Sequence, residues 1–471
     1  MTVVIMKFGS SCLKDIDAFK KILKITKIYS NIKRIYIVSA FSGITDLLLK
    51  MAQSVEFEKE LDKNMAILEK KHFDIIEQIF KEDSEEFYKT KEWVDNKLSE
   101  LEDLFSDIRE FGLEPYYQDS VLSFGEIIST YILSQYLKSK GLESVFIPAT
   151  TLLITNDDFN NAYPLYSLTN ARVERLLIPL LENLKKNTII CITGFIGRNK
   201  IGNVTTLGRG GSDYTATILA HSVYETGHDQ DIKVILWKDV DGLLATNPKY
   251  ITKASLIRSI DYEEAKHIAN FGAKVLHPKC LEAIEGKRIP LEIRNFEKPL
   301  EDKNFTTISE YSDKNFIKGI STVEDSVIIS ITSGSLVNVP GVLTKIFKTM
   351  SKNNISVSLV AQSASEVSTS FLVKKKDAEK ALMALKQSDY FSSFFEIRSK
   401  DVAIINITGM KVLDNLTKVR IFQALEKKKI QVKALTQSID ELNFSLVVER
   451  DSLTEAVKVI HNDLYEDFEY Q

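Results

Sequence analysis

The chain has 471 residues, of which 44% are hydrophobic and 27% charged, and its formal net charge is -4. This length predicts two or three domains, and the composition is typical of an ordinary soluble globular protein. The small net charge gives no indication of a nucleic-acid partner, and no apolar run is long enough to predict a membrane span.

The first twelve residues, MTVVIMKFGSSC, show neither a basic segment before an apolar run nor a small-residue cleavage site, so we expect no signal peptide. Only three cysteines occur, Cys12, Cys191 and Cys280, and their wide spacing favours a reducing cytoplasm over a disulfide framework. The six histidines show no metal-ligand spacing, so we assign no residues to a metal.

The first 300 residues alternate short β-rich runs with amphipathic helices. Strands are predicted at Val3–Phe8, Ile35–Ala40, Thr188–Gly194, Lys233–Trp237 and Ile289–Arg294. Near-continuous apolar strands between helices indicate an α/β fold, a three-layer α/β/α domain with a mostly parallel sheet covered on both faces. Ligands of such folds bind at the carboxyl ends of the strands.

Residues 50–119 interrupt this alternation. The segment is rich in Glu, Lys and long apolar residues, and its Gly and Pro lie near its end. It predicts two or three helices inserted after the second strand. They could form a lid over a site or an ordinary helical hairpin that only packs against the domain.

The stretch TTLGRGGSDYTA, Thr205–Ala216, places three glycines, an arginine and an aspartate at the start of a predicted helix. Glycine allows a ligand to approach the backbone, and a helix N-terminus attracts an anion. A glycine turn with an Arg–Asp surface pair would give the same residues, so the stretch alone does not decide.

The last 150 residues contain a repeat. The segment ISVSLVAQSASEVSTSFLV from Ile355 matches IQVKALTQSIDELNFSLVV from Ile430, 75 residues later. Each copy predicts strand, helix, strand, strand, helix, and two copies predict paired α+β modules rather than a solenoid. The second copy lacks a clear final strand, which FIKGIST before the first copy can supply. We therefore expect modules at 323–400 and at 316–322 plus 401–471, the first nested in the second.

Six N-terminal motifs, taken in order, resemble the aspartate kinases of the amino-acid-kinase superfamily. They are MKFGSS, VSAFSGITD, LSFGEIIST, TTLGRGGSDYTA, WKDVDGLLATNPK and FGAKVLHP. The repeated C-terminal modules resemble a tandem pair of ACT domains. The resemblance covers the whole chain and implies a catalytic domain at 1–300, with its helical insertion at about 50–119. Because the chain ends after the second module, no fused homoserine dehydrogenase is expected.

The physical reading of the motif residues agrees with this resemblance. Lys7 ends a buried strand, where its charge can meet a transferring phosphoryl group. Arg209 can hold a substrate carboxylate through two hydrogen bonds. The resemblance places Asp213 at the catalytic aspartate position, where we expect it to hold Lys7 and the phosphates in line. It implies aspartate contacts for Ser39, Thr45, Glu126, Arg209 and Ser212, with Glu126 receiving the substrate ammonium. Alternatively, Lys7 could be an ordinary solvated lysine at the end of a strand, and Glu126 could be an acidic residue that opens a helix.

The resemblance also implies ATP with Mg²⁺, the metal held mostly by phosphate oxygens and water. Nucleotide contacts are expected at Lys7, Gly9, Ser10, Ser11, Lys238, Asp239, Leu244, Lys249 and Lys274. The sequence departs from the family pattern here. Lys238 replaces a usual Thr, Leu244 a Tyr, Asn247 an Asp and Lys249 an Arg. Ser10 replaces the second glycine of the opening motif, so its Cβ can crowd the phosphates. Lys238 and Lys249 could equally be solvated lysines.

The sequence therefore predicts ATP-dependent phosphorylation of the L-aspartate side chain, the first step of lysine, threonine and methionine biosynthesis. A related kinase with another substrate and a non-catalytic amino-acid sensor are the alternatives. An effector, lysine or threonine, is expected at the paired ACT modules, which also predict a homodimer or larger assembly. Its expected contacts are Gln362, Ser365, Glu366 and Gln437, although Ser and Asp there also suit simple turns.

Overall fold

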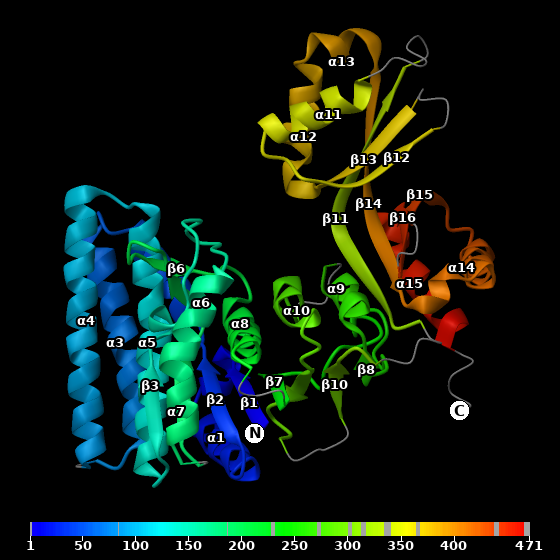
Figure 1. Ribbon diagram of the computed structural model, residues 1–471. Helices are drawn as coiled ribbons and strands as arrows, with labels where there is room; N and C mark the ends of the chain where they lie inside the picture. Colours follow the sequence, from blue (N-terminus) through cyan, green and yellow to red (C-terminus); the bar gives the residue numbers. More distant parts are fainter. Residues whose placement is uncertain are drawn as a thin grey trace. The chain divides into compact units, whose positions relative to one another are not determined.

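An eight-stranded and a six-stranded sheet organise the chain. The computed structural model describes residues 2–82, 84–185, 187–227, 231–270, 275–299, 304–311, 317–333, 341–363, 368–437 and 442–465. The first of two compact units comprises Met1–Leu243, Arg258–Ala265 and Lys274–Ser312, and the second comprises Leu244–Ile257, Lys266–Ala273 and Asp313–Gln471 (Figure 1). Each unit contains one of the two large sheets.

The sheet of the first unit has the strand order β3-β4-β2-β1-β7-β9-β10-β8. Its strands are β1 (Thr2–Phe8), β2 (Lys33–Val38), β3 (Ser144–Ile147), β4 (Ile189–Thr193), β7 (Asp231–Lys238), β8 (Ser259–Ile260), β9 (Leu291–Asn295) and β10 (Phe305–Ile308). Neighbours pair in parallel except β9 and β10, which are antiparallel. Residues 3–8 of β1 and all of β2 are buried, so both faces of this sheet are covered, as the apolar runs predict.

All five strands predicted in this region are present, displaced by no more than two residues at either end. The short strands β3, β8 and β10 were not predicted. They have 4, 2 and 4 residues, which is too short for a periodicity signal.

The helices of the first unit connect and cover these strands. They are α1 (Ile16–Ile28), α2 (Ile44–Gln53), α3 (Glu58–Ile79), α4 (Glu85–Phe111), α5 (Pro115–Ser139), α6 (Tyr166–Arg172), α7 (Ile178–Asn183), α8 (Gly211–Glu225), α9 (Tyr262–Asn270, its last residues in the second unit) and α10 (Pro278–Glu285). Three further elements matter for the site: a 3-10 turn at Ser10–Leu13, and the hairpin of β5 (Ile196–Arg198) and β6 (Val204–Thr206).

The insertion predicted at 50–119 forms the long helices α3 and α4 and the start of α5, which lie side by side in Figure 1. Their apolar faces join the same hydrophobic cluster as β1, β2 and α1, through residues such as Leu68, Val94 and Phe105. This packing supports the helical-hairpin interpretation of the segment.

The six-stranded sheet of the second unit has the order β12-β13-β11-β14-β16-β15, and all its neighbours are antiparallel. Its strands are β11 (Gly319–Thr332), β12 (Val357–Gln362), β13 (Ser368–Lys374), β14 (Glu396–Thr408), β15 (Val432–Thr436) and β16 (Asn443–Glu449). Its helices are α11 (Val342–Lys352), α12 (Lys375–Lys386), α13 (Asp389–Phe394), α14 (Asn415–Lys427) and α15 (Leu453–Tyr465).

The two long strands β11 and β14 run through both repeats. A register shift between Val323 and Ser326 divides β11 into two parts. The first part pairs with Ile404–Thr408 and contributes Ile320 to a core with α14 and α15. The second part pairs with β13 and contributes Ile329 to a separate core with α11 and α12. One strand therefore serves two hydrophobic cores.

Two observations concern the cysteines and the expected absence of a membrane span. All three cysteines are buried and unpaired, in line with the absence of a disulfide framework. Over the part of the chain that the structure describes, no helix has both the length and the apolar character needed to cross a bilayer.

Candidate active site at the carboxyl ends of the parallel strands

A hollow of about 430 Å³ opens in the first unit where β1 and β2 end. Its walls come from the loops after these strands, from α2 and α5, from the β5–β6 hairpin and from the start of α8. Its lining includes Lys7, Ser10, Ser39, Thr45, Glu126, Arg209 and Ser212, all of which the sequence predicts as site residues. The fold thus brings together residues more than 200 positions apart.

Asp213 lies next to this hollow, held between two lysines. The Nζ atom of Lys7, near the end of β1, is 2.7 Å from Oδ1 of Asp213. The Nζ atom of Lys238, the last residue of β7, donates a hydrogen bond of 2.6 Å to Oδ2. Parallel pairing of β1 with β7 sets both lysines at one edge of the sheet. Lys238 is therefore not a solvated lysine, as one interpretation of the sequence allowed.

The two lysines determine the charge state of Asp213. Burial by itself would raise the pKa of this carboxyl, but the charges of Lys238 and Lys7 and their hydrogen bonds lower it to about 2. Burial would likewise lower the pKa of Lys238, and the Asp213 carboxylate outweighs this effect and raises it. Asp213 is thus ionised at neutral pH, and Lys7, which it contacts, lines the hollow.

The glycine-rich stretch starts α8, as the sequence predicts. Gly210 caps the helix with φ of +71°, a conformation that side chains disfavour. A Cβ at Gly210 would also lie only 2.7 Å from Cβ of His277. Asp213 is in the first turn of this helix, so the same turn presents backbone N–H groups and the carboxylate toward the strand ends.

Glu126 lines the same hollow from within α5. It is only 3% exposed, and its Oε2 atom has no hydrogen-bond partner. Burial raises its pKa to about 8, against smaller opposing effects from backbone N–H groups and from Lys7. Gly125 allows this position, because a Cβ there would lie 2.9 Å from Cβ of Ala40. A buried carboxylate without a cation suits a ligand that brings one.

The other predicted substrate residues lie around the same opening. Arg209 is exposed, between Gly208 and Gly210 just before α8, and Thr45 is half-buried in the first turn of α2. Ser39 follows β2, and its carbonyl oxygen accepts a 2.8 Å hydrogen bond from the Ser129 hydroxyl. Ser212 is buried in the first turn of α8. All four line the hollow.

The predicted phosphate-side residues of the opening motif follow β1. Gly9 is buried next to Lys7, since a Cβ at this position would lie 3.2 Å from the Lys7 Nζ atom. Ser10 is exposed at the hollow, and Ser11 is half-buried in the same 3-10 turn. Asp239 follows Lys238 and is exposed.

The remaining nucleotide-side predictions fall elsewhere. Leu244 and Lys249 belong to the second unit, where Leu244 forms a bridge with Leu256. The Nζ atom of Lys249 lies 2.9 and 2.7 Å from the two carboxylate oxygens of Glu324 on β11. The Tyr250 hydroxyl donates to the same carboxylate at 2.7 Å. Lys274 lies outside the described residues.

Several residues that line the active-site hollow, or support its wall, were not predicted from the sequence. Asn160 and Phe195 both line the hollow with positive φ, of 66° and 68°. Asp119 is fully buried on α5 and accepts hydrogen bonds from the Asn160 N–H and from both the N–H and the hydroxyl of Thr206. It thereby ties the hairpin to α5. Phe195 directly follows the strand predicted at Thr188–Gly194, and this strand end is the one signal in the sequence that could have indicated the wall.

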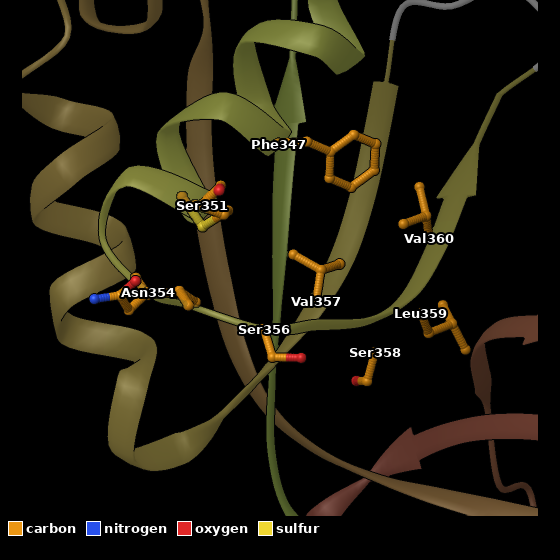
Figure 2. A pocket seen from close by; sticks show the side chains of 10 residues that line it. Phe347, Ser351, Asn354, Ser356, Val357, Ser358, Leu359 and Val360 are labelled. Carbon is orange, nitrogen blue, oxygen red and sulfur yellow. The ribbon is translucent and has the colours of Figure 1, made fainter. Parts of the chain in front are cut away.

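The predicted regulatory residues are only partly described. Gln362 is exposed at the end of β12, and Gln437 follows β15. Ser365 and Glu366 lie outside the described residues. A separate hollow of about 700 Å³ lies between α11 and the start of β12, and Figure 2 shows Phe347, Ser351, Asn354 and residues 356–360 around it. Gln362 does not line this hollow.

The sequence of this chain is similar to those of known proteins. The model of the amino acid kinase family matches residues 2–295, and an ACT domain model matches residues 329–388 and 409–464. A bifunctional aspartokinase/homoserine dehydrogenase of Buchnera aphidicola is 28% identical over 98% of this chain, and the alignment covers 56% of that protein. The chain thus spans about half the length of the first relatives it matches.

The alignment with this chain covers shorter relatives almost completely. The lysine-sensitive aspartokinase 3 of Escherichia coli is 25% identical, with 98% of this chain and 99% of that protein aligned. The crystal structure of E. coli aspartokinase III in complex with aspartate and ADP superimposes with a TM-score of 0.78 at 25% identity, covering 98% of this chain and 100% of that one. The architecture of both units, the kinase sheet and the ACT-type sheet, is thus the one seen in that structure.

Proposed function

Because the chain belongs to the amino acid kinase family, we propose that it is an aspartate kinase. It would transfer the γ-phosphoryl group of ATP to the side-chain carboxylate of L-aspartate, giving 4-phospho-L-aspartate and ADP. One observation carries this proposal: a single hollow contains a buried carboxylate that lacks a cation, Glu126, and adjoins a cationic Lys7–Asp213–Lys238 cluster. An amino acid fits the first feature and a phosphoryl group the second.

On the substrate side, the proposed contacts follow from charge. The substrate ammonium would supply the cation that Glu126 lacks, and its charge would stabilise the ionised carboxylate. The Arg209 guanidinium, exposed at the opening, would hold the α-carboxylate through paired hydrogen bonds. Ser39, Thr45 and Ser212 add hydroxyl groups around the same space. The side-chain carboxylate would then point toward the lysines.

On the phosphoryl side, the two lysines neutralise charge. An oxygen of the aspartate side chain attacks the γ-phosphorus, the bond to the β,γ-bridging oxygen breaks, and ADP leaves. Negative charge on the transferring oxygens would be stabilised by Lys7 and Lys238, whose positions Asp213 holds before the substrate binds. Because a side-chain carboxylate is already ionised near pH 7, no general base is needed.

The proposed role of Asp213 is therefore positioning. Both of its oxygens face lysines, and with a pKa of about 2 it is a poor proton acceptor. Among the described residues no cluster of three or more His, Cys, Asp or Glu side chains could cage a metal. We therefore propose that Mg²⁺ enters with the nucleotide, held by phosphate oxygens and water, where it would offset phosphate charge.

An ADP-release assay tests this function. Initial rates would be measured with MgATP and either L-aspartate, L-glutamate, N-acetylglutamate or no acceptor. We expect release to depend on aspartate, and trapping the product with hydroxylamine should give aspartyl hydroxamate. Faster turnover with another acceptor would indicate a related kinase. No turnover with any acceptor, together with aspartate binding by calorimetry, would indicate an amino-acid sensor.

We also propose feedback regulation through the ACT modules, at 323–400 and at 316–322 with 401–471. The aspartokinase 3 of E. coli is described as lysine-sensitive, so lysine is the first candidate effector and threonine the second. A pathway role before lysine, threonine and methionine, and a homodimer or larger assembly through the modules, belong to the same proposal. Titrating the three amino acids and their mixtures against initial rate tests it. A flat response without binding would leave the modules as assembly elements.

A further inference from the structure

A second hollow in the first unit, of about 660 Å³, has a charge pattern that the kinase function does not use. It lies between the π-helical turn Val173–Leu177, which joins α6 to α7, and the β5–β6 hairpin. None of its lining residues lines the hollow of Lys7 and Glu126. We refer to it as the basic hollow, because Arg172, Arg175, Arg198 and Lys200 all line it.

Among the residues that the structure describes, the four cations of the basic hollow have no acidic partners. In the part of the chain that the structure describes, none of them forms an ion pair with a carboxylate, whereas other lysines of the same unit do, such as Lys185 with Glu143 and Lys287 with Glu225. The Nη1 atom of Arg172 donates only to the Thr151 carbonyl, at 3.1 Å. Burial and the neighbouring charges of Arg198 and Arg175 lower the pKa of Arg172, and no carboxylate opposes them.

Hydrogen bonds hold the backbone on the hairpin side of the basic hollow in place. Arg198 is bound on both sides, its N–H donating to the Leu153 carbonyl at 3.0 Å and its carbonyl accepting from the Thr155 N–H at 2.8 Å. The buried Asn199 side chain donates to Asp157 and accepts from the Asn203 N–H, both at 2.8 Å. Because π-helical turns are rare and recur at functional sites, the turn carrying Arg175 is a second indication of a built site.

One wall of the basic hollow is apolar. Leu168 and Leu176 line it while remaining 41% and 40% exposed, and the buried Ile154 also lines it. Apolar carbon next to unpaired guanidinium groups suits a ligand with an anionic group at one end and a ring or hydrocarbon part at the other.

We propose that the basic hollow binds a small phosphorylated molecule that carries a di- or triphosphate group. The planar guanidinium groups of Arg172, Arg175 and Arg198 match phosphate oxygens through paired hydrogen bonds, and Lys200 adds a further charge at the rim. A multiply charged anion would relieve the repulsion among the four cations, which a single carboxylate would do only in part. This proposal is independent of the kinase function.

Isothermal titration calorimetry of the full chain with inorganic tripolyphosphate tests the proposal. The active-site lysines also attract phosphate, so three proteins are compared: the parent, Lys7→Ala, and the double variant Arg175→Gln/Arg198→Gln. We expect a binding event that survives Lys7→Ala and weakens about tenfold or more in the double variant. A matched control is Lys20→Gln/Lys89→Gln, which removes two exposed lysines that pair with carboxylates and should bind like the parent.

Several outcomes would overturn the proposal. Binding that disappears with Lys7→Ala and persists in the double variant would belong to the active site. No binding at millimolar tripolyphosphate, with thermal unfolding of the parent unchanged, would leave the basic hollow without such a ligand. If a labelled single-stranded oligonucleotide bound and tripolyphosphate did not displace it, the surface would serve nucleic acid. If sedimentation showed that the double variant alone loses a dimer, the cations would serve an interface between copies.

Discussion

Two buried carboxylates of the active-site hollow have opposite electrostatic environments. Asp213, in the first turn of α8, lies between two lysines, and its pKa is lowered to about 2. Glu126, in the middle of α5, is as deeply buried but has an Oε2 atom without a partner, and its pKa is raised to about 8. Burial raises the pKa of both, so the difference comes from the lysines, two of which contact Asp213 directly, whereas Glu126 receives only a smaller effect from Lys7.

This contrast separates prearranged from ligand-dependent parts of the site. The charges around Asp213 are compensated within the chain, so Lys7 and Lys238 are positioned before any substrate binds. Glu126 holds a proton in the free protein at neutral pH and becomes a charged carboxylate when a cationic ligand binds, so it can contribute selectivity for an amino acid. Substitutions on the two sides are therefore expected to alter different kinetic constants.

Lys7→Ala should have the largest effect. It removes a cation that we assign to the transferring phosphoryl group, so kcat is expected to fall by about a hundredfold to a thousandfold. Asp213 keeps its contact with Lys238, so the fold should persist, as thermal unfolding would show. Lys89→Ala, which removes an exposed lysine paired with Glu85, is the control and should leave kcat unchanged. A kcat within a few-fold of the parent in Lys7→Ala would contradict the assignment.

Arg209→Ala should affect the substrate side. The loss of a paired contact to the α-carboxylate is expected to raise KM for aspartate by about tenfold to a hundredfold, with KM for ATP almost unchanged. Arg209→Lys tests the geometry, because lysine keeps the charge without the planar pair of donors and should restore only part of the affinity. An equal rise in both KM values would assign Arg209 to the nucleotide instead.

Glu126 should make aspartate binding dependent on pH. Its folded-state pKa of about 8 lies above the ordinary value of 4.5, so the free protein holds a proton there at neutral pH. The ammonium contact needs the carboxylate, so KM for aspartate should fall by up to about fiftyfold between pH 6 and 8, and binding should release a proton. Glu126→Gln should raise KM and remove this pH dependence, whereas Glu297→Gln, an exposed control, should change neither.

The same shift has a consequence for stability with a definite sign. Between pH 4.5 and about 8 the folded chain binds more protons at Glu126 than the unfolded chain does, so this group makes the folded state less stable as pH rises. Glu126→Gln should flatten the dependence of the unfolding free energy on pH over that range. An unchanged profile in urea titrations at several pH values would mean that Glu126 is ionised in the free protein.

Much of the site was predictable because its motifs lie at strand ends and helix starts. Lys7 at the end of β1 and Asp213 at the start of α8 follow from the pattern of elements, since parallel strands present their carboxyl ends at one edge. The pairing of Lys238 with Asp213 was not predicted, because it depends on β7 lying beside β1. The sequence places these two residues 25 positions apart with no periodicity to connect them.

Other features depend on tertiary packing alone. The raised pKa of Glu126 reflects its burial, and the wall around Asn160 and Phe195 reflects positive φ at residues other than glycine. The ion pair of Lys249 with Glu324 joins residues 75 positions apart. Such contacts have no local signal, which is why the sequence could leave Lys249 open as a solvated lysine.

Ser10→Gly should have the smallest effect. It tests whether the phosphoryl side of the site, which contains Lys7 and Lys238, already accommodates ATP without a change at Ser10. Ser10 stands where the family pattern has glycine, and the structure places it exposed at the hollow, one residue from the buried Gly9. If its Cβ crowds the phosphates, glycine should lower KM for ATP, with a change in kcat below about threefold, because no charge is altered. A large loss of kcat in Ser10→Gly, restored in Ser10→Thr but not in Ser10→Ala, would show that the hydroxyl contacts the phosphates. The prearranged side would then depend on a neutral donor as well as on Lys7 and Lys238.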